Sequence, residues 1–148
     1  MAGILNLVGN TPMVELKRIA VNKHVTIFAK LEGHNPGGSV KDRAAYGMIK
    51  GAIDRGEIKR GTKLIEATSG NTGIALAMIA SLFGIEIELV MPEDATRERI
   101  LTMQAFGAKV ILWKLASAGS RDERHYLAAA RSRGREPAGG SPGAAHRH

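Results

Sequence analysis

The chain has 148 residues, of which 44% are hydrophobic, and it contains 18 glycines and no cysteine. This length fits one globular domain, and the lack of cysteine excludes a disulfide framework, a thiolate nucleophile and a thiolate-bound metal. The formal net charge is +7, and more than half of this excess lies in residues 113–148.

Strand-like apolar runs alternate with helix-like segments as far as Leu112. This alternation predicts an α/β fold with a parallel sheet and crossover helices. We expect strands at residues 25–31, 64–67, 85–91 and 109–112, and helices at residues 40–55, 72–83 and 95–106. The helix at residues 72–83 is apolar on every side, so we expect it to be buried.

Capping residues mark the ends of these helices. We expect Ser39 to cap the first helix, with Asp42 completing a capping box, and Thr96 to cap the third. A glycine follows each of the three helices, at Gly56, Gly84 and Gly107. These glycines are predicted to stop the helices in the left-handed conformation.

Residues 113–148 differ in composition from the rest of the chain. They are rich in Ala, Arg, Gly and Ser and have little apolar periodicity, which predicts a disordered basic tail. A solvated tail is the simpler interpretation, and an electrostatic arm for nucleic acid or anionic lipid is the alternative. Because aromatic residues are not interleaved with these charges, the sequence argues against single-stranded nucleic acid as the partner.

No membrane span or targeting segment is expected. The longest nearly apolar run, residues 74–85, has twelve residues, whereas a span needs about 20. Residues 1–12 lack the basic flank and the long apolar stretch of a signal peptide. We therefore expect a soluble, cytoplasmic protein.

A glycine-rich loop at residues 35–43 places Lys41 in the first turn of a helix. The partial positive charge of a helix N-terminus disfavours an ammonium group and lowers its pKa, which makes a neutral, nucleophilic amine easier to reach. Such an amine could hold a carbonyl cofactor as a Schiff base. The alternative is an exposed lysine in a basic first turn.

A second loop, residues 68–73, follows a predicted strand and opens the buried helix. The hydroxyls of Thr68, Ser69 and Thr72, the amide of Asn71 and the backbone N–H groups suit a carboxylate or a phosphate. The alternative is a turn that satisfies only its own backbone. The glycine spacing fits neither the dinucleotide fingerprint nor the P-loop, so nucleotide binding is not indicated.

Taken together, these stretches resemble the cysteine synthase (O-acetylserine sulfhydrylase) family of fold-type II pyridoxal-phosphate enzymes, and most of all its B type. The resemblance covers residues 1–112. It is carried by VGNTPMV (8–14), AKLE (29–32), NPGGSVKDRAA (35–45), IEATSGNTGIALAMIA (65–80), MPEDATRERI (91–100) and AFGAKVIL (105–112).

The resemblance implies pyridoxal 5'-phosphate as the cofactor and no metal. It implies that Lys41 forms the Schiff base and serves as acid and base at the substrate's α-carbon, and that Asn71 binds the cofactor's ring hydroxyl. Thr68, Ser69, Gly70 and Thr72 then bind the substrate's α-carboxylate.

The implied reaction converts O-acetylserine and sulfide into cysteine and acetate, in intact members that form homodimers. Cystathionine β-synthase and serine or threonine dehydratase use the same chemistry and are alternatives within the family. An alternative of another class is a non-catalytic binding fragment with a basic tail.

The resemblance also implies parts that residues 113–148 do not contain. Family members continue into a second carboxylate contact, a Gly/Thr-rich loop for the cofactor phosphate, and a Ser or Thr facing the pyridine nitrogen. We therefore expect residues 1–112 to be the N-terminal part of a truncated or frameshifted cysteine synthase that has no turnover by itself. Residues 94–106 resemble part of a segment that closes over the site.

Overall fold

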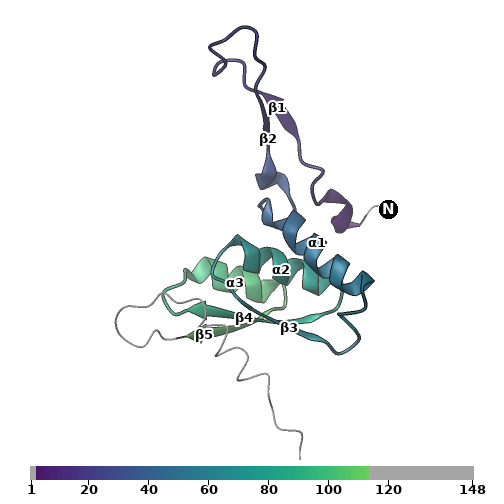
Figure 1. Cartoon of the computed structure of the whole chain (residues 1–148). Coiled ribbons are helices and arrows are strands. Elements are labelled where there is room, and N and C mark those ends of the chain that lie inside the picture. Colours follow the sequence, from purple (N-terminus) through teal and green to yellow (C-terminus); the bar gives the residue numbers. More distant parts are fainter. Residues whose placement is uncertain (1–2, 114–148) are drawn as a thin grey trace, which may run out of the picture.

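The computed structural model describes residues 3–113, and it contains a three-stranded parallel sheet of order β3-β4-β5. In the sheet, Ile65 pairs with Glu88, and Glu88 pairs with Lys109. The three α-helices cover one face of this sheet (Figure 1). The strands are β3 (Lys63–Ala67), β4 (Glu86–Pro92) and β5 (Lys109–Trp113), and the helices are α1 (Lys41–Asp54), α2 (Asn71–Leu82) and α3 (Arg97–Ala105). The predicted α/β class is confirmed, as are these elements to within two residues at each end.

The core lies between α2 and the helix-covered face of the sheet. From Ala75 to Ala80 every residue of α2 is buried, as its apolar composition predicts. The sheet contributes Ile87, Leu89 and Met91, alternate residues of β4 that point to the same face. Beside this core the ring of Tyr46, on α1, stacks on that of Phe83 with the ring centroids 6.4 Å apart.

The predicted strand at residues 25–31 does not belong to the parallel sheet. Its ordered part is β2 (Phe28–Lys30), which pairs in antiparallel fashion with β1 (Met13–Glu15). The two strands form an arm that projects from the helix-covered body (Figure 1). The sequence prediction failed here because apolar runs this short carry no information about the partner strand or its direction.

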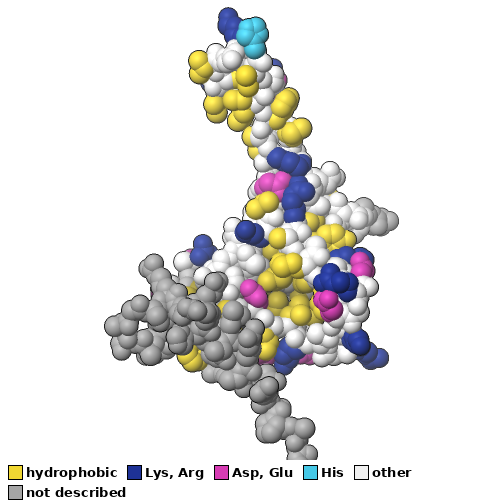
Figure 2. Space-filling model, viewed as in Figure 1, with side chains coloured by type: hydrophobic (Ala, Val, Ile, Leu, Met, Phe, Trp, Pro, Cys, Tyr) yellow, Lys and Arg dark blue, Asp and Glu magenta, His cyan; other side chains and the backbone are white. Residues whose placement is uncertain are grey.

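The arm is unusually apolar on its surface (Figure 2). Met13 and Ile19 are each 63% exposed, Phe28 is 56% exposed and Val21 is 97% exposed. Contiguous exposed apolar surface of this kind commonly marks a contact site.

The ends of the helices agree in part with the capping predictions. Gly56, Gly84 and Gly107 all have positive φ angles, which confirms the left-handed stops. The predicted capping box is wrong in its Asp42 part, because Asp42 accepts a hydrogen bond from the backbone N–H of Gly37 rather than closing on Ser39. The Ser39 hydroxyl does accept a backbone N–H at the helix start, that of Lys41. Thr96 occupies the N-cap position of α3 as predicted, but its side chain makes no capping hydrogen bond.

The face of the sheet opposite to the helices carries a charged cluster near the start of its strands. Glu88 is 8% exposed, and its Oε1 accepts hydrogen bonds from Lys109 at 2.8 Å and from Lys63 at 3.4 Å. The two lysines, Lys109 foremost, lower the pKa of Glu88. The expected disordered tail lies outside the described residues, apart from Trp113, which ends β5. Within residues 3–113 no helix has the length and apolar character needed to cross a bilayer.

Candidate functional site

Lys41 is the first residue of α1 and is exposed. Its backbone N–H donates to the hydroxyl of Ser39 at 3.1 Å, which fixes the backbone at the start of the helix. Its side-chain amine makes no hydrogen bond or ion pair with another residue of the described part of the chain. The amine is therefore available to a ligand.

The second predicted loop lies where β3 ends and α2 begins. The backbone N–H of Thr68 donates to the carbonyl of Val90 at 3.1 Å, which fixes the loop to the sheet edge where the strands end. Gly70 occupies the N-cap position and offers no side-chain cap. Within residues 3–113, the side chains of Thr68, Ser69, Asn71 and Thr72 make no hydrogen bond, so their donors are free for a bound anion.

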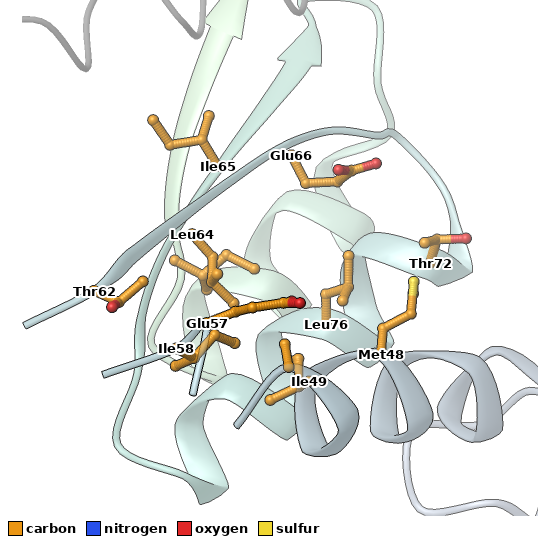
Figure 3. A pocket seen from close by; sticks show the side chains of 12 residues that line it. Met48, Ile49, Glu57, Ile58, Thr62, Leu64, Ile65, Glu66, Thr72 and Leu76 are labelled. Carbon is orange, nitrogen blue, oxygen red and sulfur yellow. The ribbon is translucent and has the colours of Figure 1, made fainter. Parts of the chain in front are cut away.

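A cavity of about 480 Å³ shows how the two helices lie relative to each other. Thr72, near the start of α2, lines it beside Met48, which lies two turns into α1, and Leu76 lines it beside Ile49 (Figure 3). The start of α2, which follows the second loop, thus lies against the first half of α1, two turns along that helix from Lys41. Of the predicted site residues only Thr72 lines this mostly apolar cavity, so the cavity itself does not suit a phosphate-bearing ligand.

The third helix touches the second loop at two points. Arg99 donates from Nη1 to the carbonyl of Ser69 at 3.3 Å. Met103, which is fully buried, packs against Gly73 in the first turn of α2. From the family resemblance, residues 94–106 are expected to belong to a segment that closes over the site. The two contacts show that α3, within this segment, lies next to the second loop.

Three charged residues in or before the first turn of α1 have contacts that the sequence analysis did not predict. Asp42 is fully buried, and burial raises the pKa of its carboxyl. Its Oδ1 has no hydrogen-bond partner within the described ranges, and a β-carbon on Gly37 would lie 2.5 Å from that atom. Glu32 and Arg43 form an ion pair at 2.8 Å, and hydrogen bonds, first that from Arg43, lower the pKa of Glu32 to about 2.

No pattern in the sequence points to these contacts. Glu32 and Arg43 are eleven residues apart and lie in different elements, so no helical or strand spacing relates them. Asp42 is typical of a helix start, where a carboxylate is usually solvated rather than buried.

The side chains present fit part of a pyridoxal-phosphate group. Lys41 offers a free amine, the kind of group that reacts with a carbonyl carbon, and Asn71 offers a free amide, which can bind a hydroxyl; neither side chain is engaged elsewhere in residues 3–113. The hydroxyls and N–H groups at residues 68–72 suit the carboxylate of an amino acid.

The chain is similar in sequence to a family of known enzymes. A family model described as pyridoxal-phosphate dependent enzyme matches residues 4–144. The chain is 58% identical over 105 residues to cysteine synthase B of Salmonella typhimurium, covering 71% of this chain and 35% of that protein. It is 47% identical over 108 residues to an O-acetylserine dependent cystathionine beta-synthase of Bacillus subtilis, covering 73% and 35%.

The fold is also similar to solved structures. A crystal structure of cysteine synthase from Entamoeba histolytica superposes with a TM-score of 0.79 at 36% identity, covering 90% of this chain and 39% of that one. The chain thus spans about a third of the length of the curated relatives it matches. The family match continues past residue 112, so the predicted boundary between residues 112 and 113 stays a prediction.

Proposed function

This chain belongs to the pyridoxal-phosphate dependent enzyme family, and we propose that it carries two parts of a cysteine synthase site. These are the cofactor-binding lysine, Lys41, and the loop that binds the substrate carboxylate, residues 68–72 (the carboxylate loop). The observation that carries the proposal is that two sets of free donors, on Lys41 and on residues 68–72, each lie at the start of a helix, and that these two helices, α1 and α2, pack against each other. The 58% identity to a cysteine synthase B supports the choice of reaction.

The roles follow from the donors that each residue offers. The backbone N–H groups and hydroxyls of Thr68, Ser69, Gly70 and Thr72 bind the α-carboxylate of O-acetylserine, and Asn71 donates to the ring hydroxyl of the cofactor. Lys41 holds the cofactor and moves the proton at the α-carbon of the substrate. When bound, pyridoxal phosphate supplies an electron sink for the pair left on that carbon. The overall reaction replaces the acetate of O-acetylserine with sulfide to give cysteine.

Reductive labelling tests the role of Lys41 directly. The chain is incubated with pyridoxal phosphate, reduced with borohydride and digested, and the labelled lysines are identified by mass spectrometry. We expect the label on Lys41 rather than on Lys30, Lys50 or Lys59, because Lys41 alone joins a glycine-rich loop to a helix start. Label spread evenly over the four lysines contradicts the proposed function.

A chimaera tests the reaction. Residues 1–112 replace the matching segment of the Salmonella cysteine synthase B, and cysteine formation from O-acetylserine and sulfide is measured beside the Lys41→Ala version. We expect turnover that this substitution abolishes. If the chimaera stays active after Lys41→Ala, another amine performs the role proposed for Lys41, and the proposal is wrong.

Cystathionine β-synthase is the second candidate, because the Bacillus subtilis relative aligns with 73% of this chain. The name of that relative specifies the same amino-acid substrate, O-acetylserine. The carboxylate loop and Lys41 would act on that shared substrate in both reactions. A chimaera with the remainder of that relative is expected to form cystathionine.

A further inference from the structure

The loop that carries Lys41 starts at a fully engaged amide. Asn35 is 3% exposed, and its Oδ1 accepts a hydrogen bond from the backbone N–H of Gly9 at 2.8 Å. Its Nδ2 donates both to the carbonyl of Glu32 at 2.8 Å and to Oε2 of Glu32 at 2.9 Å. The first residue of the loop therefore cannot turn without breaking three hydrogen bonds.

The same carboxylate holds the other end of the loop. Arg43 donates from Nε to Oε2 of Glu32 at 2.8 Å and from Nη2 to Oε1 at 2.9 Å, a two-point contact that fixes direction as well as distance. Its Nη2 also donates to the carbonyl of Gly9 at 2.7 Å. Gly9 has φ +79°, and a β-carbon there would lie 2.5 Å from Nη1, so only glycine lets the guanidinium pack this closely.

We propose that Glu32 is a positioning residue for Lys41. Its carboxylate bonds to Asn35 at the start of the loop and to Arg43 at the end, and Lys41 lies between them, so one side chain sets the path of the backbone that presents the amine. This inference rests on the proposed function, in which Lys41 holds the cofactor. Glu32 itself makes no hydrogen bond or ion pair with the amine or with residues 68–72.

The negative charge of Glu32 allows its carboxylate to accept hydrogen bonds from both ends of the loop. With a pKa of about 2, Glu32 is ionised at every pH at which a lysine amine can react. Thr11 supplies a further donor, its hydroxyl lying 2.8 Å from Oε1. A glutamine at position 32 keeps the size but loses the charge and turns one acceptor into a donor that faces the donors of Arg43 or Asn35.

Glu57 offers a matched control. It accepts the same two-point contact from Arg55, at 2.7 Å from Nε and 2.9 Å from Nη2, but it follows the end of α1 and bonds to no part of the loop. Glu57→Gln thus removes an equivalent ion pair without touching the path of residues 35–43.

The test uses the whole chain, pyridoxal phosphate, borohydride and peptide mapping, with the ratio of label on Lys41 to label on Lys50 as the readout. Far-UV circular dichroism and urea unfolding check that each variant is folded. We expect Glu32→Gln to lower the ratio roughly tenfold or more, the factor that a hydrogen bond to a charged group contributes. Glu57→Gln should leave the ratio unchanged.

The outcomes separate the two proposals. Even labelling in the parent chain overturns the proposed function and this inference with it. Selective labelling of Lys41 that persists in a folded Glu32→Gln variant overturns this inference alone. If Glu32→Gln unfolds, Arg43→Lys decides, since it keeps the charge but loses the two-point contact. A folded Arg43→Lys variant with a lowered ratio supports the inference, and one with the parent's ratio overturns it.

Discussion

The side chain of Met103 fills the space that a β-carbon on Gly73 would need. Such an atom would lie 2.8 Å from Cε of Met103 and 2.7 Å from Cγ2 of Thr68. Met103 is fully buried and cannot move aside cheaply. The glycine in the first turn of α2 therefore brings α3 against the loop that precedes α2.

This contact predicts opposite effects for two helical glycines. Gly47 lies on the exposed side of α1, and a β-carbon there would meet no atom within 4 Å, so Gly47→Ala should stabilise the fold by about 0.5–1 kcal/mol through helix propensity. Gly73→Ala should lose that gain to overpacking that costs about 1–3 kcal/mol. Urea unfolding of the two variants measures the difference. Equal stabilisation by both would show that Met103 and Thr68 yield.

Asp42→Asn should stabilise the fold at neutral pH. Burial raises the pKa of Asp42 from its usual 3.8, so the folded state disfavours the charge that the unfolded state carries freely. The contribution of Asp42 to stability therefore favours folding below its unfolded pKa and is lost as the pH rises through its folded pKa.

The measurement is the urea midpoint of the parent and of Asp42→Asn, at neutral pH and below pH 3.8. The advantage of the variant should shrink in acid. Asp54→Asn, which removes only an exposed ion pair with Lys50, is the control and should change stability by about 0.5 kcal/mol or less. An advantage of Asp42→Asn that is constant with pH would contradict burial of the charge as the cause.

Glu32 should give the opposite pH dependence. Its pKa falls from 4.5 to about 2 on folding, so its ion pair favours the folded state above pH 4.5 and loses this effect as the pH falls towards 2. The stability difference between the parent and Glu32→Gln should be constant above pH 4.5 and should shrink below it. Chemical unfolding across this range, with Glu57→Gln beside it, provides the test.

Polar substitutions on the arm should change association rather than stability. Val21 is 97% exposed and Phe28 is 56% exposed, so Val21→Lys and Phe28→Lys should each alter the free energy of unfolding by about 0.5 kcal/mol or less. They should reduce self-association, measured by sedimentation, because they interrupt the exposed apolar surface. Ile79→Ala, in the core, provides the contrast, with an expected loss of about 2–5 kcal/mol.

The sequence predicted the parallel sheet and its helices well because their signals are local. The run from Ile74 to Ala80 is apolar on all sides, and a helix with no polar side must be buried. Alternation of strands and helices then leaves little choice of topology.

The arm and the surroundings of Lys41 could not be predicted in the same way. The three residues of β1 pair with β2 across an intervening loop, and no short-range pattern encodes that pairing. Glu32, Asn35 and Arg43 come together only because the chain turns back on itself before α1. Polar residues of these types are usually exposed to solvent, so the sequence gives no sign that Asn35 is buried.

The strand order has a consequence for how the sheet opens. β4 has a hydrogen-bonded neighbour on each side, whereas no described residue pairs with the outer edge of β3 or of β5. Residues 88–90 of β4 have a paired strand on each side, so their amide protons are the best shielded, whereas the outer edge of β3 has no hydrogen-bonded strand among the described residues. In deuterated buffer the β3 edge should exchange first and β4 last, so the sheet comes apart from its margins towards its centre.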